Sequence, residues 1–168
     1  MEQLEQRVTD LERRLAALEE AGDRPAPRPG EGDFWALEGL KEQLAELEAA
    51  DGGVLFTGAV RLPTGEQYGW QHGTLTDGLM DADWADSAEV FAALGHPVRL
   101  RLLREILGGR RTAAELAELD GVGTTGQIYH HLRQLTGAGW LHTTGRGRHE
   151  VPPGRVVPLL VALSTARH

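Results

Sequence analysis

The 168-residue sequence contains no cysteine, only one lysine and few aromatic residues. The absence of cysteine excludes disulfide bonds, thiolate chemistry and metal sites with sulfur ligands. The longest apolar run covers residues 156–163 and contains Pro158, so it is too short to span a membrane. The first residues, MEQLEQRV, are acidic and polar, whereas a secretory signal is basic and then apolar. We therefore expect a cytoplasmic protein with no membrane partner.

Motifs that carry catalysis are also missing. The sequence has no glycine-rich phosphate loop, nucleophile elbow or paired-carboxylate motif. Its seven histidines are scattered, and the adjacent His130 and His131 would point about 100° apart on a helix, which makes a shared ion difficult. We therefore predict that the protein is not an enzyme and has no cofactor or metal site.

The charge is distributed unevenly along the chain. The net charge is −8, yet residues 88–168 carry ten arginines against six acidic residues. Residues 1–52 carry fourteen acidic and six basic side chains, and residues 53–87 carry five and one. A positive segment in an acidic chain indicates either a surface that meets phosphate groups or a solvated basic face.

Residues 1–20 have the heptad spacing of a coiled coil. Positions a and d hold Met1, Leu4, Val8, Leu11, Leu15 and Leu18. A parallel pair would set Arg7 against Glu12 and Arg14 against Glu19, whereas an antiparallel pair would bring like charges together. We predict a parallel coiled coil that joins two chains. The alternative is an amphipathic helix that folds onto its own chain.

Three segments follow the heptads. Residues 21–32 contain three prolines and no periodicity, which predicts a semi-extended linker. Residues 33–50 predict an amphipathic helix capped by Asp33, which either extends the dimer or packs on the next segment. Residues 53–73 alternate on either side of a Pro-Thr-Gly-Glu turn, which predicts a β-hairpin.

Two strands alone are marginally stable in water, so the aromatic face of this hairpin needs a cover. The face would carry Val54, Phe56, Tyr68 and Trp70, and we expect the second helix, a partner chain or a ligand to cover it. We favour an ordinary small core here. The alternative is an effector pocket formed by Phe56, Tyr68, Trp70 and Trp84.

Residues 86–168 contain a succession of helix start and stop signals. Asp86 with Glu89 predicts a capped helix through Leu94, and Pro97 opens a second helix that ends near Leu107. Thr112 and Glu115 form a capping box for a short helix, and Gly121-Val-Gly123 supplies a turn. Pro158 predicts the start of a last helix. Its apolar stripe, Leu159, Leu160 and Leu163, is expected to take part in dimerisation.

A second capping box, Thr124 with Gln127, opens a helix over residues 125–135. Its inward stripe is Ile128, Leu132 and Leu135, and its outer faces carry Thr125, Gln127, Tyr129, His130 and Arg133. Two short strands then flank Gly145-Arg-Gly147, a hairpin tip that presents Arg146 and Arg148.

The runs ALGHPVRLRLLREI and IYHHLRQLTGAGWL, with the arginine hairpin after them, resemble ArsR-type winged helix-turn-helix transcriptional regulators. The resemblance covers roughly residues 87–166. It implies a homodimer, built from the helices nearest each end of the domain, that represses transcription and is released by an effector. It also implies that the outer residues of helix 125–135 face the major groove and that Arg146 and Arg148 touch the flanking backbone or minor groove.

Individual residues then have expected roles. Thr124 and Thr125 would contact phosphate at the helix N-terminus, and Gln127 either reads an adenine edge or only closes its capping box. His130 and Arg133 would contact backbone or guanine, while His131 matches a structural position of the family. The segment AAELAELD lacks the cysteines of metal-sensing members, and the last helix has no ligand before His168, so any effector is sensed elsewhere.

The sequence thus predicts a mainly α fold with small β elements (α+β). We expect a dimeric, nucleoid-associated regulator, a repressor, that reads an inverted repeat in double-stranded DNA and responds to a small-molecule effector. The alternative is a winged-helix and coiled-coil adaptor that binds other proteins and lacks sequence-specific DNA binding.

Overall fold

The computed structural model describes residues 34–167. The chain divides into a unit of residues 1–42 and a unit of residues 43–168, and helix α2 (Trp35–Glu46) crosses the boundary. The predicted coiled coil and linker lie outside the described residues, as do the dimerisation residues Leu4, Val8, Leu11, Leu15 and Leu18. No helix within residues 34–167 is long and apolar enough to cross a membrane.

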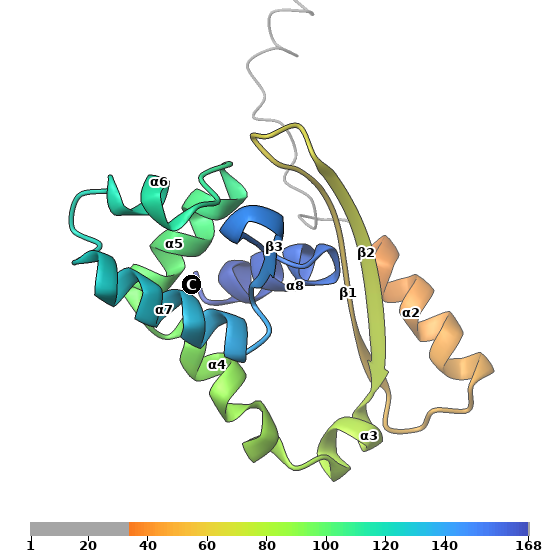
Figure 1. The fold of residues 1–168 in the computed structure, drawn as a ribbon. Coiled ribbons are helices and arrows are strands. Elements are labelled where there is room, and N and C mark those ends of the chain that lie inside the picture. The colour runs from red at the N-terminus through yellow and green to blue at the C-terminus, as the bar shows by residue number, and fades with distance from the viewer. Residues whose placement is uncertain (1–33, 168) are drawn as a thin grey trace, which may run out of the picture. The chain divides into compact units, whose positions relative to one another are not determined.

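The second unit begins with a long hairpin of strands β1 (Gly53–Arg61) and β2 (Gln67–Leu75), seen in Figure 1. The strands are antiparallel, and their register pairs Gly58 with Trp70 and Val60 with Tyr68. Because side chains alternate between faces, this register places Val54, Phe56, Tyr68 and Trp70 on one face, as predicted.

Helix α8 (Pro153–Thr165) crosses this face of the hairpin (Figure 1) and contacts both strands. A Cβ atom at Gly58 would lie 2.6 Å from Cγ1 of Val157, so only glycine allows so close an approach. The ring of Trp70 lies against Gly154. A helix of the same domain therefore covers part of the face, which was none of the three expected covers.

Four short elements lead from the hairpin to the centre of the domain: α3 (Thr76–Asp81), a 3₁₀ turn η1 (Trp84–Ser87), α4 (Ala88–Leu94) and α5 (Pro97–Leu107). The predicted cap at Asp86 is wrong. Asp83 instead caps η1 by accepting from Ala85 N at 2.9 Å, and α4 continues from that turn without a side-chain cap. Helix α5 begins at Pro97 as predicted, with His96 Nδ1 accepting from Val98 N at 3.2 Å.

The next elements are α6 (Ala113–Ala117), α7 (Thr125–Gly137), β3 (His142–Thr144), the 3₁₀ turn η2 (Gly145–Gly147) and β4 (Arg148–Glu150). Both predicted capping boxes are present, Thr112 with Glu115 and Thr124 with Gln127. Helices α6 and α7 contact each other, and β3 pairs with β4. This order is a helix-turn-helix followed by a two-stranded wing.

The start of the last helix differs from the prediction. Helix α8 begins at Pro153, and Pro158 lies inside it, where it lacks the N–H that a helix interior normally uses. Val156 and Val157 are at most 1% exposed, so tertiary burial extends the helix by a turn before Pro158. Pro153 takes the first-turn position that the sequence analysis assigned to Pro158, so that prediction is wrong.

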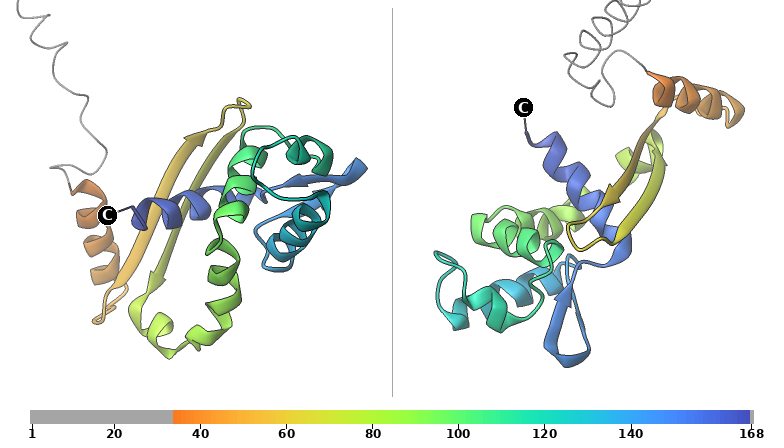
Figure 2. Two further views of the ribbon diagram at one scale, coloured as in Figure 1. Left: turned by 90° about the vertical axis from the view of Figure 1, so that its left-hand side faces the viewer. Right: turned by 90° about the horizontal axis from the view of Figure 1, so that it is seen from above.

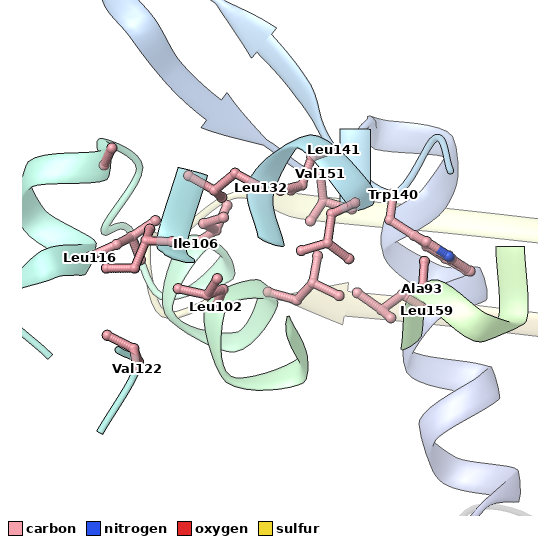
Figure 3. Close-up of a cluster of buried hydrophobic side chains, with 14 of the residues drawn as sticks. Ala93, Leu102, Ile106, Leu116, Val122, Leu132, Trp140, Leu141, Val151 and Leu159 are labelled. Atoms are coloured by element: carbon pink, nitrogen blue, oxygen red, sulfur yellow. The ribbon is translucent and has the colours of Figure 1, made fainter. Parts of the chain in front are cut away.

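One hydrophobic core lies between α5, α6, α7 and α8, as Figure 3 shows. Leu102 and Ile106 of α5 meet Leu116 of α6 and Leu132 of α7. Trp140 joins the core and donates its indole N–H to the Val90 carbonyl at 2.9 Å. Residues 34–167 thus form a mixed helical fold with two small sheets, which agrees with the predicted α+β class.

Candidate nucleic-acid interface

Helix α7 divides cleanly into a buried face and an exposed face. Ile128, Leu132 and Leu135 are at most 1% exposed, which confirms the predicted inward stripe. The predicted outer residues are all exposed: Thr125, Gln127, Tyr129, His130 and Arg133. Tyr129 is 51% exposed although it is a large aromatic side chain. The helix has no acidic residue, so nothing on it would repel a phosphate group.

Two residues close the N-terminus of α7. Thr124 Oγ1 accepts from Gln127 N at 3.4 Å, and Gln127 Oε1 accepts from Thr124 N at 2.8 Å. Gly123 has a φ of +94°, and a Cβ atom there would lie 2.4 Å from Gln127 Oε1. The turn before α7 therefore requires glycine for the cap to form.

The cap bears on how Gln127 can contact DNA. A bidentate contact to adenine uses both the oxygen and the nitrogen of the amide. Because the oxygen already accepts from Thr124, the capping interpretation of Gln127 is the one that the structure shows. The amide nitrogen has no hydrogen-bond partner among residues 34–167, so it remains able to donate to a ligand.

The wing, strands β3 and β4, projects from the helical body in both views of Figure 2. Arg146 lies exposed at its tip with a φ of +66°, a left-handed conformation that is costly for a residue with a side chain. Arg148 begins β4 and is half-buried, and its backbone forms an isolated antiparallel β-bridge with Thr112. The two predicted wing arginines therefore occupy different environments, and Arg146 is the more accessible.

Arg111 anchors the base of the wing. Its carbonyl accepts from His149 N at 2.7 Å, and its guanidinium pairs with Glu150 at 3.1 Å and with Glu66 of the β1–β2 turn. Burial acts to lower the pKa of Arg111, but hydrogen bonds and charge from the two carboxylates outweigh it and raise the pKa. No local signal in the sequence indicates this role of Arg111, because its partners are 45 and 39 positions away.

Two histidines near the interface have lowered pKa values. The Nδ1 atoms of His131 and His149 are buried without a hydrogen-bond partner in the described part of the chain. Burial lowers the pKa of both imidazoles, and the charges of His96, Arg99 and His130 lower that of His131 further. The ring of His131 lies 4.7 Å from that of His96, inside the domain, which suits the structural role expected for it.

The four aromatic residues predicted as an effector pocket do not share one environment. Tyr68 packs against the core, and Phe56 lies 5.8 Å from the ring of His72. Trp84 is exposed and donates its indole N–H to Leu79 O at 2.7 Å. An effector site at these residues stays a prediction.

The leucines of the last helix also differ from one another. Leu159 is fully buried within its own chain, so it cannot contribute to a dimer surface as predicted, whereas Leu160 and Leu163 are partly exposed. Among residues 34–167 there is no group of three or more His, Asp or Glu side chains placed to hold a metal ion.

Comparison with protein families gives a match in the centre of the domain. Residues 94–143, from the end of α4 into β3, match a family described as a helix-turn-helix domain. No curated protein matches the chain. The matched segment contains α5, α6 and α7. These three helices are therefore those of a helix-turn-helix domain, the kind found in DNA-binding regulators.

Proposed function

We propose that this protein is a dimeric, sequence-specific DNA-binding regulator of the ArsR type, a repressor that reads an inverted repeat. Helix α7 enters the major groove of each half-site, and the two half-sites lie about one helical turn apart. The predicted coiled coil at residues 1–20 joins the two chains.

One observation carries the proposal: α7 buries its aliphatic stripe completely and turns an acid-free polar face outward beside an exposed arginine tip. Thr124 and Thr125 sit at the helix N-terminus, where backbone N–H groups favour a phosphate. His130 and Arg133 are exposed further along the helix. Arg146, and to a lesser degree Arg148, supply contacts to the DNA backbone that do not depend on sequence.

The test first requires a DNA duplex that the protein binds. Fragments of genomic DNA that bind the purified full-length protein are selected, and the affinity for one selected duplex is measured by fluorescence anisotropy at several salt concentrations. We expect log K to fall linearly with log salt. Arg146→Ala should weaken binding to selected and scrambled duplexes alike, and should make the salt slope shallower by about one for each phosphate that the protein no longer neutralises.

Arg61→Ala is the matched control, because Arg61 is an exposed arginine on β1 and lies outside the proposed interface. It should leave both the affinity and the slope unchanged. Equal effects of the two substitutions would contradict the wing assignment. Absence of any salt-dependent duplex binding would instead favour the adaptor alternative, in which the chain binds other proteins.

A further inference from the structure

A half-open apolar cavity of about 600 Å³ lies between α5, α8 and the turn of the β1–β2 hairpin. Its apolar walls are Leu62, Pro63, Leu100, Leu103, Leu107, Leu159, Leu160 and Leu163. The volume falls within the range of about 300–1,000 Å³ that small-molecule sites occupy. None of the aromatic residues considered above as an effector pocket lines it.

The charged residues of the cavity have one sign. Arg101 and Arg104 line it, and no acidic side chain does. Arg101 already donates to the carbonyl of Asp120. Arg104 is exposed, and its guanidinium has no hydrogen bond or ion pair with any other residue of 34–167. Leucine walls beside an unpaired cation match a ligand with an apolar body and one negative head.

We propose that this cavity binds a small amphipathic carboxylate, an alkyl or aryl acid, with its apolar part against the leucines and its carboxylate paired with Arg104. The ligand is a single small molecule rather than a second copy of the chain, because a protein surface would have to bring an acidic side chain onto Arg104 and also fill a concave space. This ligand site does not depend on whether the protein binds DNA.

The cavity walls are connected with the DNA-reading elements in two places. Leu62 and Pro63 belong to the same hairpin turn as Glu66, which pairs with Arg111 at the base of the wing. Arg101 holds the Asp120 carbonyl in the turn between α6 and α7. A carboxylate that draws Arg101 toward the cavity, or an apolar body that shifts the hairpin turn, disturbs the geometry needed for DNA binding. This second step rests on the proposed function, and it makes the ligand a releasing effector.

Decanoate is a suitable probe for the site, with decyltrimethylammonium as a control that has the same chain and the opposite charge. Isothermal titration of the full-length protein should show one decanoate per chain and binding of the cationic control at least about tenfold weaker. Arg104→Ala should weaken decanoate binding about tenfold, and Arg104→Lys should restore most of it.

Arg110→Ala is the matched control, because Arg110 is exposed beyond the end of α5, pairs with Glu105 at 3.8 Å and lies outside the cavity. It should leave decanoate binding unchanged. Each variant is checked by thermal unfolding, so that a failure to bind is not a failure to fold. Equal binding of the two amphiphiles, or decanoate binding indifferent to Arg104→Ala, would overturn the site.

Sedimentation with and without decanoate tests the other occupant. If decanoate binds only as the dimer dissociates, a second copy covers the cavity and the proposal is wrong. The coupling step has its own readout, which is duplex affinity in saturating decanoate. Binding of decanoate without any change in duplex affinity would overturn the coupling and leave the site intact. A protein that binds decanoate but no duplex would instead overturn the proposed function.

Discussion

Gln127 uses its amide oxygen for the helix cap and leaves its amide nitrogen for a partner. The two atoms can be separated by substitution, because glutamate keeps an acceptor at the cap and has no N–H to donate. The capping role of Gln127 and its proposed role in DNA binding can therefore be tested independently.

We predict that Gln127→Glu keeps the free energy of unfolding within about 0.5 kcal/mol of the wild type, since a negative charge is favourable in the first turn of a helix. Gln127→Ala should lose about 1 kcal/mol. Both variants should lose the preference for the selected duplex at the base that Gln127 faces. Urea unfolding and competition binding measure the two effects, and a wild-type base preference in Gln127→Glu would show that the nitrogen does not read DNA.

His149 makes stability depend on pH. In the folded chain, burial lowers the pKa of His149 below its ordinary value of 6.5. As the pH falls, the imidazole therefore takes up a proton in the unfolded chain before it does so in the folded chain. The contribution is present in full above pH 6.5 and is lost as the pH drops toward the folded pKa. His131 acts in the same direction.

We predict that His149→Leu unfolds with a smaller drop in melting temperature between about pH 7.5 and pH 5.5 than the wild type. The double variant with His131→Leu should flatten the dependence further. Thermal unfolding at matched ionic strength measures it. A pH dependence in His149→Leu as steep as in the wild type would mean that the buried imidazole does not carry the effect.

Arg99 of α5 connects its helix to α4 and α7. Its guanidinium donates to Ala93 O at 2.6 Å and Ala92 O at 2.8 Å at the end of α4, and to Gln134 Oε1 of α7 at 2.6 Å. Helix ends leave carbonyl groups without partners inside the helix. Arg99 satisfies Ala93 O, and it adds a second donor to Ala92 O, which also accepts from Gly95 N at 3.1 Å. Its bond to Gln134 also ties α5 to α7.

We predict that Arg99→Ala lowers the free energy of unfolding by about 1–3 kcal/mol, because it removes several hydrogen bonds from one charged donor. Arg99→Lys should recover little, since one ammonium cannot reproduce the planar fork of donors. Arg110→Ala, which removes one long surface pair, should cost less than about 1 kcal/mol. Denaturant titrations of the three variants test this, and equal stability of Arg99→Ala and Arg110→Ala would refute it.

The sequence was most informative where signals are local. The capping boxes at Thr112 and Thr124 are set by residues three positions apart, and the inward stripe of α7 by the period of a helix, so both could be predicted. The local rule gave the wrong start for the last helix, because it was applied to Pro158, whereas the helix begins at Pro153. Burial of Val156 and Val157 decides between them, and that depends on the whole domain.

Contacts between distant segments could not be predicted in the same way. Nothing near Arg111 in the sequence indicates that it pairs with Glu66 of the hairpin and Glu150 of the wing. The cavity walls likewise come from three segments whose leucines look like ordinary core residues one segment at a time. The outward face of the candidate site was thus predictable, whereas the anchor of its wing was not.

At the scale of the whole molecule, the charge is segregated in a way that suits a DNA reader. The acidic residues are concentrated in residues 1–87, and the net positive segment is the one that contains α7 and the wing. An acidic remainder opposes non-specific attraction to DNA, while the positive segment favours approach by one surface. The charge distribution therefore favours contact between DNA and residues 88–168.

Amide hydrogen exchange of the full-length protein, free and bound to a selected duplex, identifies the residues that meet DNA. We expect new protection at residues 124–133 and 145–148, with strands β1 and β2 unchanged or altered only near Glu66. Protection confined to the hairpin or to α8, with residues 124–133 exchanging as in the free protein, would contradict DNA reading by α7 and the wing.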